Sequence, residues 1–178
     1  MWKAPDAATV SFVGAKVAAL VIDKDDSLRV AGEEALVREL TARGLQGVPS
    51  YRMIPKEELL SAEKARPWFE RAGIQGVVAL RVINDDRRKT VVPGQWTSEY
   101  YQSFWGYYGY GWGAVYTPGY VRDERIVSLE TLIFSVPKNV LVWAGQSVTE
   151  NPKDGRKVVE EVVKEAVSEM RKQGLVNR

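Results

Sequence analysis

The sequence predicts an α/β fold, a two-layer α+β domain in which a mixed sheet carries helices on at least one face. Three observations lead to this expectation. A short β-branched run, KVAALVI at residues 16–22, is followed by a helical pattern. The same helix-to-strand connection is used twice, as GLQGV at 44–48 and GIQGV at 73–77. Two long strand-like runs and an amphipathic helix end the chain, so the expected order is β-α-β-α-β, a long aromatic loop, and then β-β-α.

The first strand and the first helix have clear boundaries. Residues 16–22 are a short apolar run of the kind that makes a buried strand. DDS at 25–27 supplies an N-cap, after which apolar or small residues recur every four positions towards Arg43. Gly44 suits the left-handed residue that follows a helix. We therefore predict a helix between the N-cap and Arg43.

A second helix is predicted between Pro55 and Ala72, followed by a third strand at 76–84. Pro67 lies inside this helix and is expected either to kink it or to split off its last turn. The charged run DDRRK is expected to end the strand. Because the two helix-to-strand connections are alike, we expect parallel strands joined by right-handed crossovers.

The last part of the chain predicts a hairpin and a helix. The runs RIVSLETLIFSV and NVLVWAGQSVT flank a short link at 137–139, which is expected to be the hairpin turn. A continuous apolar stripe then indicates a last helix, with Asn151 or Asp154 as its N-cap. We expect one domain over residues 1–178, with an extended N-terminal arm at 1–15.

The composition excludes several classes of function. The 178 residues include no Cys and no His, which excludes disulfides, Cys–His zinc sites and His-dependent nucleophilic catalysis. A net charge of +2 gives no argument for nucleic acid as a partner. No apolar run reaches the length of a membrane span, and the start of the chain lacks the pattern of a secretory leader. No cofactor is expected, because GYGWG at 109–113 lacks the strand–helix context of a nucleotide loop.

A Gly-rich aromatic segment, YYQSFWGYYGYGWGAVY at 100–116, lies within a long excursion at 85–121 and holds half of the chain's aromatic residues. Together these rings exceed about 1,000 Å², more than a soluble monomer exposes. Their cover could be the protein's own sheet, a second copy, or a glycan or lipid surface. Four Gly residues add flexibility that core filling does not need, which favours a partner. The candidate binding residues are Tyr101, Phe104, Trp105, Tyr107, Tyr108, Tyr110, Trp112 and Tyr116.

Two opposite charges interrupt apolar strand candidates, Arg81 in VVALRVI and Glu130 in VSLETLIF. Buried charges are normally paired, so we expect a structural ion pair between neighbouring strands, within hydrogen-bonding distance. The alternative is a polar site in the sheet with a perturbed carboxylate.

Five aspartates follow the predicted strands at 16–22 and 76–84. If these strands are parallel neighbours, the carboxylates gather at one edge of the sheet, where they could bind Mg²⁺ or Ca²⁺. Interleaved Lys and Arg residues favour helix capping and a solvated edge instead, so no metal site is expected. The aspartates are Asp23, Asp25, Asp26, Asp85 and Asp86.

Several stretches match one known pattern in order: KVAALVIDKDDSLRVAGEEALVRELTARGLQGVPSYRMIP, the aromatic segment, the ET inside a strand, and the WAG after the hairpin turn. Together they resemble a family of small bacterial envelope lipoproteins of uncharacterised function. The resemblance implies a periplasmic domain tethered through an N-terminal lipidated Cys, which this chain does not contain. The element order is also similar to that of the N-terminal domain of the Tol-Pal translocation protein and of ring-forming outer-membrane secretion lipoproteins.

These features predict a non-enzymatic envelope module that uses its aromatic loop to bind itself or another envelope protein. Binding of a glycan or a lipid surface is the alternative. The rival class is a carboxylate-dependent glycan hydrolase, which needs two carboxyl groups about 5–10 Å apart across a cleft. Glu99 and Glu130 are the nearest candidates, and pairing of Glu130 with Arg81 would remove the acid.

Overall fold

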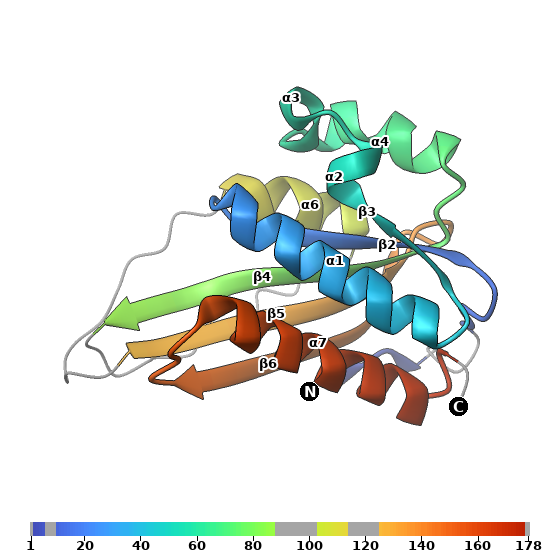
Figure 1. Ribbon diagram of the computed structural model, residues 1–178. Helices are drawn as coiled ribbons and strands as arrows, with labels where there is room; N and C mark the ends of the chain where they lie inside the picture. The colour runs from blue at the N-terminus through green and yellow to red at the C-terminus, as the bar shows by residue number, and fades with distance from the viewer. Residues whose placement is uncertain (1, 6–9, 88–102, 114–124, 177–178) are drawn as a thin grey trace.

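The computed structural model describes residues 2–5, 10–87, 103–113 and 125–176. Within these residues the strands form a six-stranded sheet in the order β1-β6-β5-β4-β2-β3 (Figure 1). This confirms the predicted α/β class and its mixed sheet. The strands are β1 (Trp2–Lys3), β2 (Lys16–Ile22), β3 (Gln46–Pro49), β4 (Gly76–Arg87), β5 (Arg125–Ser135) and β6 (Val140–Glu150). The helices are α1 (Asp26–Ala42), α2 (Ser50–Met53), α3 (Lys56–Leu59), α4 (Ala62–Arg71), α6 (Phe104–Gly113) and α7 (Gly155–Lys172).

The strand pairing confirms the two predicted parallel connections. β2 lies between β3 and β4 and runs parallel to both, with Ala18 opposite Val48 and Val77. β4, β5 and β6 then form an antiparallel meander, and residues 136–139 make the predicted hairpin turn. The N-terminal arm contributes β1, which pairs with β6 at the edge of the sheet.

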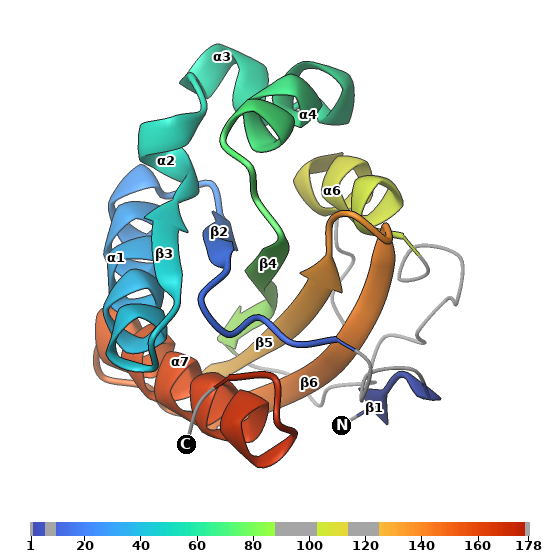
Figure 2. The same cartoon turned by 90° about the vertical axis from the view of Figure 1, so that its right-hand side faces the viewer.

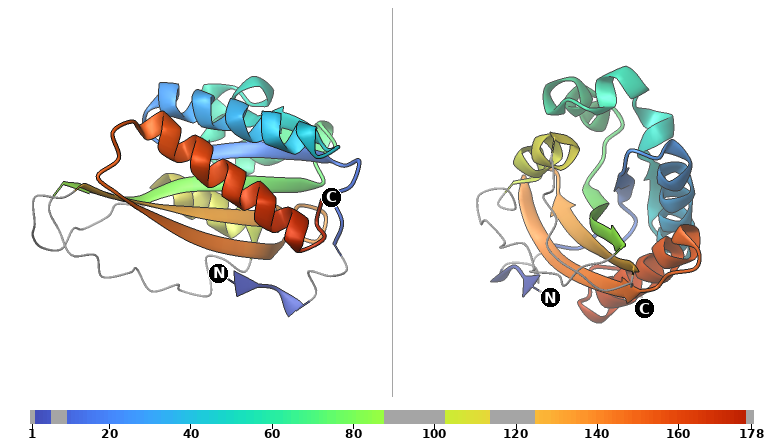
Figure 3. Two further views of the ribbon diagram at one scale, coloured as in Figure 1. Left: turned by 60° about the horizontal axis from the view of Figure 1, so that its bottom comes forward. Right: turned by 90° about the vertical axis from the view of Figure 1, so that its left-hand side faces the viewer.

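Helices cover both faces of the sheet. α1 and α7 lie side by side across one face, whereas α4 and α6 lie over the other (Figures 2 and 3). In the described parts of the chain, no helix is long and apolar enough to cross a bilayer. Successive residues of β2 serve the two layers alternately: Val17, Ala19 and Val21 pack beneath α1 and α7, and Ala18, Leu20 and Ile22 pack towards α4 and α6.

The helix boundaries follow the predicted caps. The Asp25 carboxylate accepts hydrogen bonds from the backbone N–H groups of Ser27 and Leu28, at 2.8 and 3.2 Å, and so starts α1. Gly44 follows that helix with a φ of 80°, a left-handed conformation that Gly adopts at little cost. Of the two candidate caps for α7, Asp154 is the one used, and it accepts a backbone hydrogen bond at 2.9 Å.

The prediction of one helix between Pro55 and Ala72 is wrong. Two separate helices, α3 and α4, lie in this range, and a short helix that was not predicted, α2, precedes it. The residue before a proline is disfavoured in helical conformation, and Ile54 is extended, so α2 ends ahead of Pro55. Ser61 caps α4 and starts it anew. Pro67 lies inside α4 and does not divide it.

Two parts of the predicted excursion are regular elements. β4 continues to Arg87, past the predicted end at Asn84, with a bulge beside Asn84. The Asp85 carboxylate accepts two hydrogen bonds at 2.7 Å from Arg125 of β5. These bonds help to keep the charged end of β4 paired with β5. α6 stands where the sequence predicts a Gly-hinged loop. Each Gly lowers helix stability by about 1 kcal/mol relative to Ala, so contacts with the rest of the fold must hold α6 in place.

Candidate functional site

α6 is fixed at its start by a side chain from a distant turn. Asn139, in the β5–β6 turn with a φ of 52°, accepts at Oδ1 a hydrogen bond from the Phe104 N–H at 3.1 Å. Ser103 Oγ accepts the Gly106 N–H at 3.1 Å. Both bonds satisfy N–H groups that the first turn of a helix leaves without a partner. The hairpin turn therefore determines where α6 begins.

Three rings of α6 pack onto its own domain. Phe104, Tyr107 and Tyr108 are fully buried. The Phe104 ring meets Phe69 of α4 edge-on with centroids 5.3 Å apart, and Tyr107 stacks on Phe134 of β5 at 5.5 Å. For these three residues the cover is the protein's own sheet and α4, which is the first of the alternatives weighed from the sequence.

Trp105 lies half-buried at the junction of α4 and α6. Its ring is 5.6 Å from Phe69, and the guanidinium of Arg66 is 5.4 Å from its ring centroid. Along α4, Trp68 is half-buried beside Arg71, whose guanidinium lies 4.3 Å from the ring. Both arginines are exposed. We call Arg66, Trp68, Arg71 and Trp105 the aromatic rim.

The expected ion pair lies beneath α6. Arg81 and Glu130 are directly opposite each other on β4 and β5. Arg81 Nε donates to Glu130 Oε1 at 2.6 Å, and the two side chains are only 8% and 1% exposed. The Tyr107 hydroxyl donates to the same oxygen at 3.0 Å. The guanidinium of Arg81 is also 5.6 Å from the Tyr107 ring, so this tyrosine joins the helix to the charged pair.

A second buried carboxylate, which sequence reasoning missed, joins α1, β2 and α2. Glu33 accepts at Oε1 from Ser50 Oγ at 2.6 Å and from the Val21 N–H at 3.2 Å. Its Oε2 accepts the Tyr51 N–H at 2.8 Å. Burial raises the pKa of Glu33 above its ordinary value, because its effect is larger than that of these hydrogen bonds, which lower the pKa. Its place three residues before the buried Leu36 is the sequence signal that could have identified it.

The end of α6 contacts α3 and α1. The Tyr108 hydroxyl donates to the Leu59 carbonyl at 2.5 Å, and burial raises the pKa of Tyr108. Trp112 is half-buried, with its ring 6.1 Å from that of Tyr108 and 5.9 Å from the guanidinium of Arg29. α6 thus connects the segment α3–α4 to the first turn of α1.

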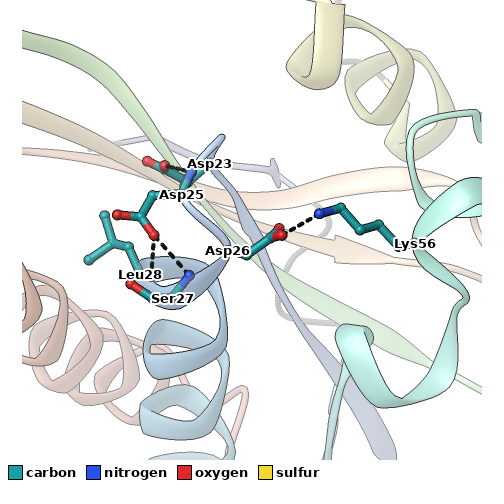
Figure 4. Close-up of polar contacts among 6 residues, drawn as sticks. All are labelled: Asp23, Asp25, Asp26, Ser27, Leu28 and Lys56. Atoms are coloured by element: carbon teal, nitrogen blue, oxygen red, sulfur yellow. Dashed lines mark hydrogen bonds and ion pairs between the residues drawn. The ribbon is translucent and has the colours of Figure 1, made fainter.

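Three of the five aspartates at the strand ends, Asp25, Asp26 and Asp85, act in a helix cap and in ion pairs, and the side chain of Asp86 is outside the described part of the structure. Figure 4 shows Asp25 at the start of α1 and Asp26 paired with Lys56 of α3. Asp23 accepts the Asp25 N–H at 2.7 Å, and burial raises the pKa of Asp23. Asp85 is bound by Arg125. Over the described ranges, no three acidic side chains are grouped so that they could hold a metal ion.

Some candidate residues lie outside this description. Tyr101 and Tyr116 fall outside the described residues, as does Glu99, the second carboxylate of the rival hydrolase. Tyr110 belongs to α6, but only its backbone is described. The structure brings the remaining candidates into one cluster around α6.

Fold and site together define an α/β scaffold whose second layer is built around an aromatic helix. No protein-family model matches the chain, and no curated protein sequence matches it. Among solved structures it is similar to bacterial lipoproteins. A PelC dodecamer from Paraburkholderia phytofirmans is 13% identical, with 95% of this chain and 93% of that chain covered and a TM-score of 0.49. Lipoprotein GNA1162 from Neisseria meningitidis is 10% identical over 89% and 99% of the chains (TM-score 0.45), and a minor lipoprotein from Acinetobacter baumannii is 11% identical over 92% and 97% (TM-score 0.39).

Proposed function

We propose that this protein is a non-enzymatic binding and assembly module of the bacterial envelope, held at the membrane by an N-terminal lipid. The envelope location rests on the sequence resemblance described above. The binding role rests mainly on one observation: a helix of aromatic and Gly residues is anchored to the sheet by three buried rings, while Trp105 remains half-exposed at the junction with α4. A second copy of the chain is the partner that we favour.

The aromatic rim has the composition of a protein–protein contact. Trp and Arg are the residue types that contribute most to such interfaces. Each Trp of the rim carries an Arg on its ring, and α4 and α6 are fixed to each other through Phe69. A surface that is already ordered loses little entropy on binding. These features support docking on the outer side of α4 and α6.

The state of Glu130 supports the non-enzymatic reading. A glycan hydrolase needs two carboxyl groups that reach the substrate. Glu130 is 1% exposed and accepts hydrogen bonds from both Arg81 and Tyr107. The carboxylate is therefore committed to holding the sheet and α6 together.

Molar mass in solution tests the self-association. We expect the intact chain to form an oligomer by light scattering and Trp105→Ser to have a lower mass at the same concentration, with an unchanged circular dichroism spectrum. Val13→Ser is the control, because Val13 is 51% exposed and lies in the turn before β2. A monomeric intact chain, or an unchanged mass for Trp105→Ser, contradicts the proposal.

A glycan or lipid surface is the second candidate partner, because Trp rings with attached cations suit membrane interfaces as well as proteins. Flotation of the protein with vesicles of phosphatidylethanolamine and phosphatidylglycerol tests the lipid case. If Trp105→Ser lowers flotation while the mass of the intact chain is that of a monomer, the lipid surface replaces the second copy as the partner.

A further inference from the structure

The two outer edges of the sheet differ in how well they are protected from pairing with another strand. At one edge, β3 has only four residues and ends in Pro49, which has no N–H to donate. At the other edge, β6 has eleven residues, and β1 pairs with only Trp143 and Ala144 of them (Figure 3). In the described part of the chain, the outer edge of β6 beyond Ala144 therefore carries no paired strand.

The neighbouring pairs show which backbone groups of β6 face this open edge. The Val142 carbonyl accepts the Ala4 N–H at 3.0 Å, so the backbone groups of Val142 point outward. Beyond this residue, β6 pairs with β5 without a shift in register. Because the backbone groups of an antiparallel strand point alternately to its two sides, every second residue from Val142 presents its N–H and C=O to the edge. Past β1, these residues are Gln146, Val148 and Glu150.

The open stretch lacks the features by which edge strands usually avoid pairing. Residues 145–150, GQSVTE, contain no Pro and no Lys, and their only charge is that of Glu150 at the end. Val148 is 57% exposed. Protected edge strands are short, or carry a Pro, a bulge or charges along their length. An exposed edge without these features is suited to accept a further strand by backbone hydrogen bonding.

One antiparallel register fits this stretch to a second copy of itself. When Val148 lies opposite Val148 of the second copy, Gln146 lies opposite Glu150 of that copy, and the paired residues exchange about six backbone hydrogen bonds. The Gln146 amide can then donate to the opposite carboxylate, and no two like charges face each other. A slide of two residues one way puts Glu150 opposite Ala144, which β1 already occupies. A slide the other way puts Gln146 opposite Pro152, which has no N–H.

We propose that two copies of the chain pair through the open edge of β6, antiparallel about a two-fold axis at Val148, so that their sheets become continuous. The contact is isologous, because the same stretch serves both copies. The paired stretch is short, so we expect a weak contact with a dissociation constant of about 0.1 mM, which leaves the chain monomeric through this edge at micromolar concentrations. It uses none of the aromatic rim and does not depend on the assembly proposed for that surface.

Amide hydrogen exchange at two protein concentrations tests the pairing. The full-length Trp105→Ser chain is used, so that the aromatic rim does not contribute. Between about 0.01 and 1 mM protein, we expect exchange to slow about fourfold at the amides of Gln146, Val148 and Glu150, as the monomer fraction falls. The amides of the residues between them point to β5 and should exchange slowly, at the same rate, at both concentrations.

Charges at the two-fold position test the register. A side chain at position 148 faces its own counterpart, so Val148→Lys and Val148→Glu should each weaken the dimer about fivefold, as measured by sedimentation equilibrium in the same Trp105→Ser chain. A 1:1 mixture of the two variants should restore it, because opposite charges then face each other. Val140→Lys is the matched control, since Val140 is 39% exposed on the same strand but lies outside the paired stretch.

Two results would overturn the proposal. The first is exchange at the three outward amides that does not change with concentration, whether it is fast or already slow in the monomer. The second is a dimer that Val148→Lys and Val140→Lys affect equally, or one that the mixture of Val148→Lys and Val148→Glu does not restore. Because Trp105 is substituted throughout, neither result bears on the aromatic rim.

Discussion

At the scale of single residues, the fold depends on two buried carboxylates, each of which joins elements that are distant in the sequence. Glu130 joins β5, β4 and α6 through Arg81 and Tyr107. Glu33 joins α1 to β2 and α2 through three hydrogen bonds. Both hold helices against the sheet, so both are expected to affect stability more than surface charges do.

Removing one member of the Arg81–Glu130 pair should destabilise the protein much more than removing both. Glu130→Leu leaves the buried guanidinium without its counter-charge, and we expect the free energy of unfolding to fall by about 3–5 kcal/mol. Arg81→Met together with Glu130→Leu removes both charges and should recover most of that loss. Urea unfolding of the single and double variants measures the coupling. Additive losses would show that the two side chains do not act as a pair.

The raised pKa of Glu33 predicts a specific pH dependence. The folded state holds the Glu33 proton more tightly than the unfolded chain, whose ordinary pKa is 4.5. The contribution of Glu33 to stability therefore falls as pH rises from this value through the raised folded-state pKa, and is constant above it. Glu33→Gln lacks this slope. The free energy of urea unfolding, measured for the intact protein and for Glu33→Gln from pH 4.5 to neutral pH, checks this prediction. Parallel curves of free energy against pH would contradict it.

At the scale of elements, α6 exists because of its surroundings and in spite of its sequence. A ten-residue helix with four Gly residues is not stable alone. It is capped by Asn139 across the sheet, covered by Phe69, and tied to Glu130 and Leu59 by tyrosine hydroxyls. Such long-range contacts are not visible in the local pattern, which is why the segment looks like a loop in the sequence.

The hydrogen bond by which Asn139 caps α6 can be tested separately from the left-handed backbone conformation of this residue. Asn139→Gly keeps the left-handed turn but removes the acceptor for the Phe104 N–H, and loss of this hydrogen bond should lower the free energy of unfolding by about 1 kcal/mol. Asn139→Ala also strains the backbone and should cost about 1–2 kcal/mol more. Hydrogen exchange should be faster at the Phe104 amide in both variants. Unchanged exchange there would mean that Asn139 does not cap α6.

The packing of α1 on α7 depends on a small residue. A Cβ at Gly32 would lie 3.0 Å from both Val159 and Val21, so Gly32→Leu should overpack this contact and cost about 1–3 kcal/mol or more. Gly155→Ala is the control, because its Cβ would meet only Leu28 at 3.8 Å. Thermal unfolding compares the two. Equal stability of both variants would contradict the close contact.

Elements with local signals were predictable, and those with non-local causes were not. The strand at 16–22, the Asp25 cap, the hairpin turn and the stripe of α7 each follow from neighbouring residues. The Arg81–Glu130 pairing also followed, since a charge in an apolar strand needs a partner. The breaks around Pro55 depend on competing caps, and α6 depends on tertiary contacts, so neither could be predicted from local propensity.

At the scale of the whole molecule, the aromatic segment has two roles, completion of the core and assembly, which were alternatives at the level of the sequence. Its inner rings complete the second core of the sheet, around Phe134 and Leu132. Its outer ring, Trp105, joins α4 in a surface that we propose for assembly. Cover by the protein's own sheet and contact with a partner are therefore compatible, because they use adjacent sides of one helix.

The most direct test of this account replaces residues 100–116 with a short Gly-Ser linker and measures molar mass and urea stability together. The account predicts that the intact chain is an oligomer, and that the shortened chain is a folded monomer of clearly lower stability, because one sheet face loses three buried rings and Glu130 loses the Tyr107 hydroxyl. A shortened chain that forms an oligomer of the same size as the intact protein and has the same stability would contradict both roles of α6.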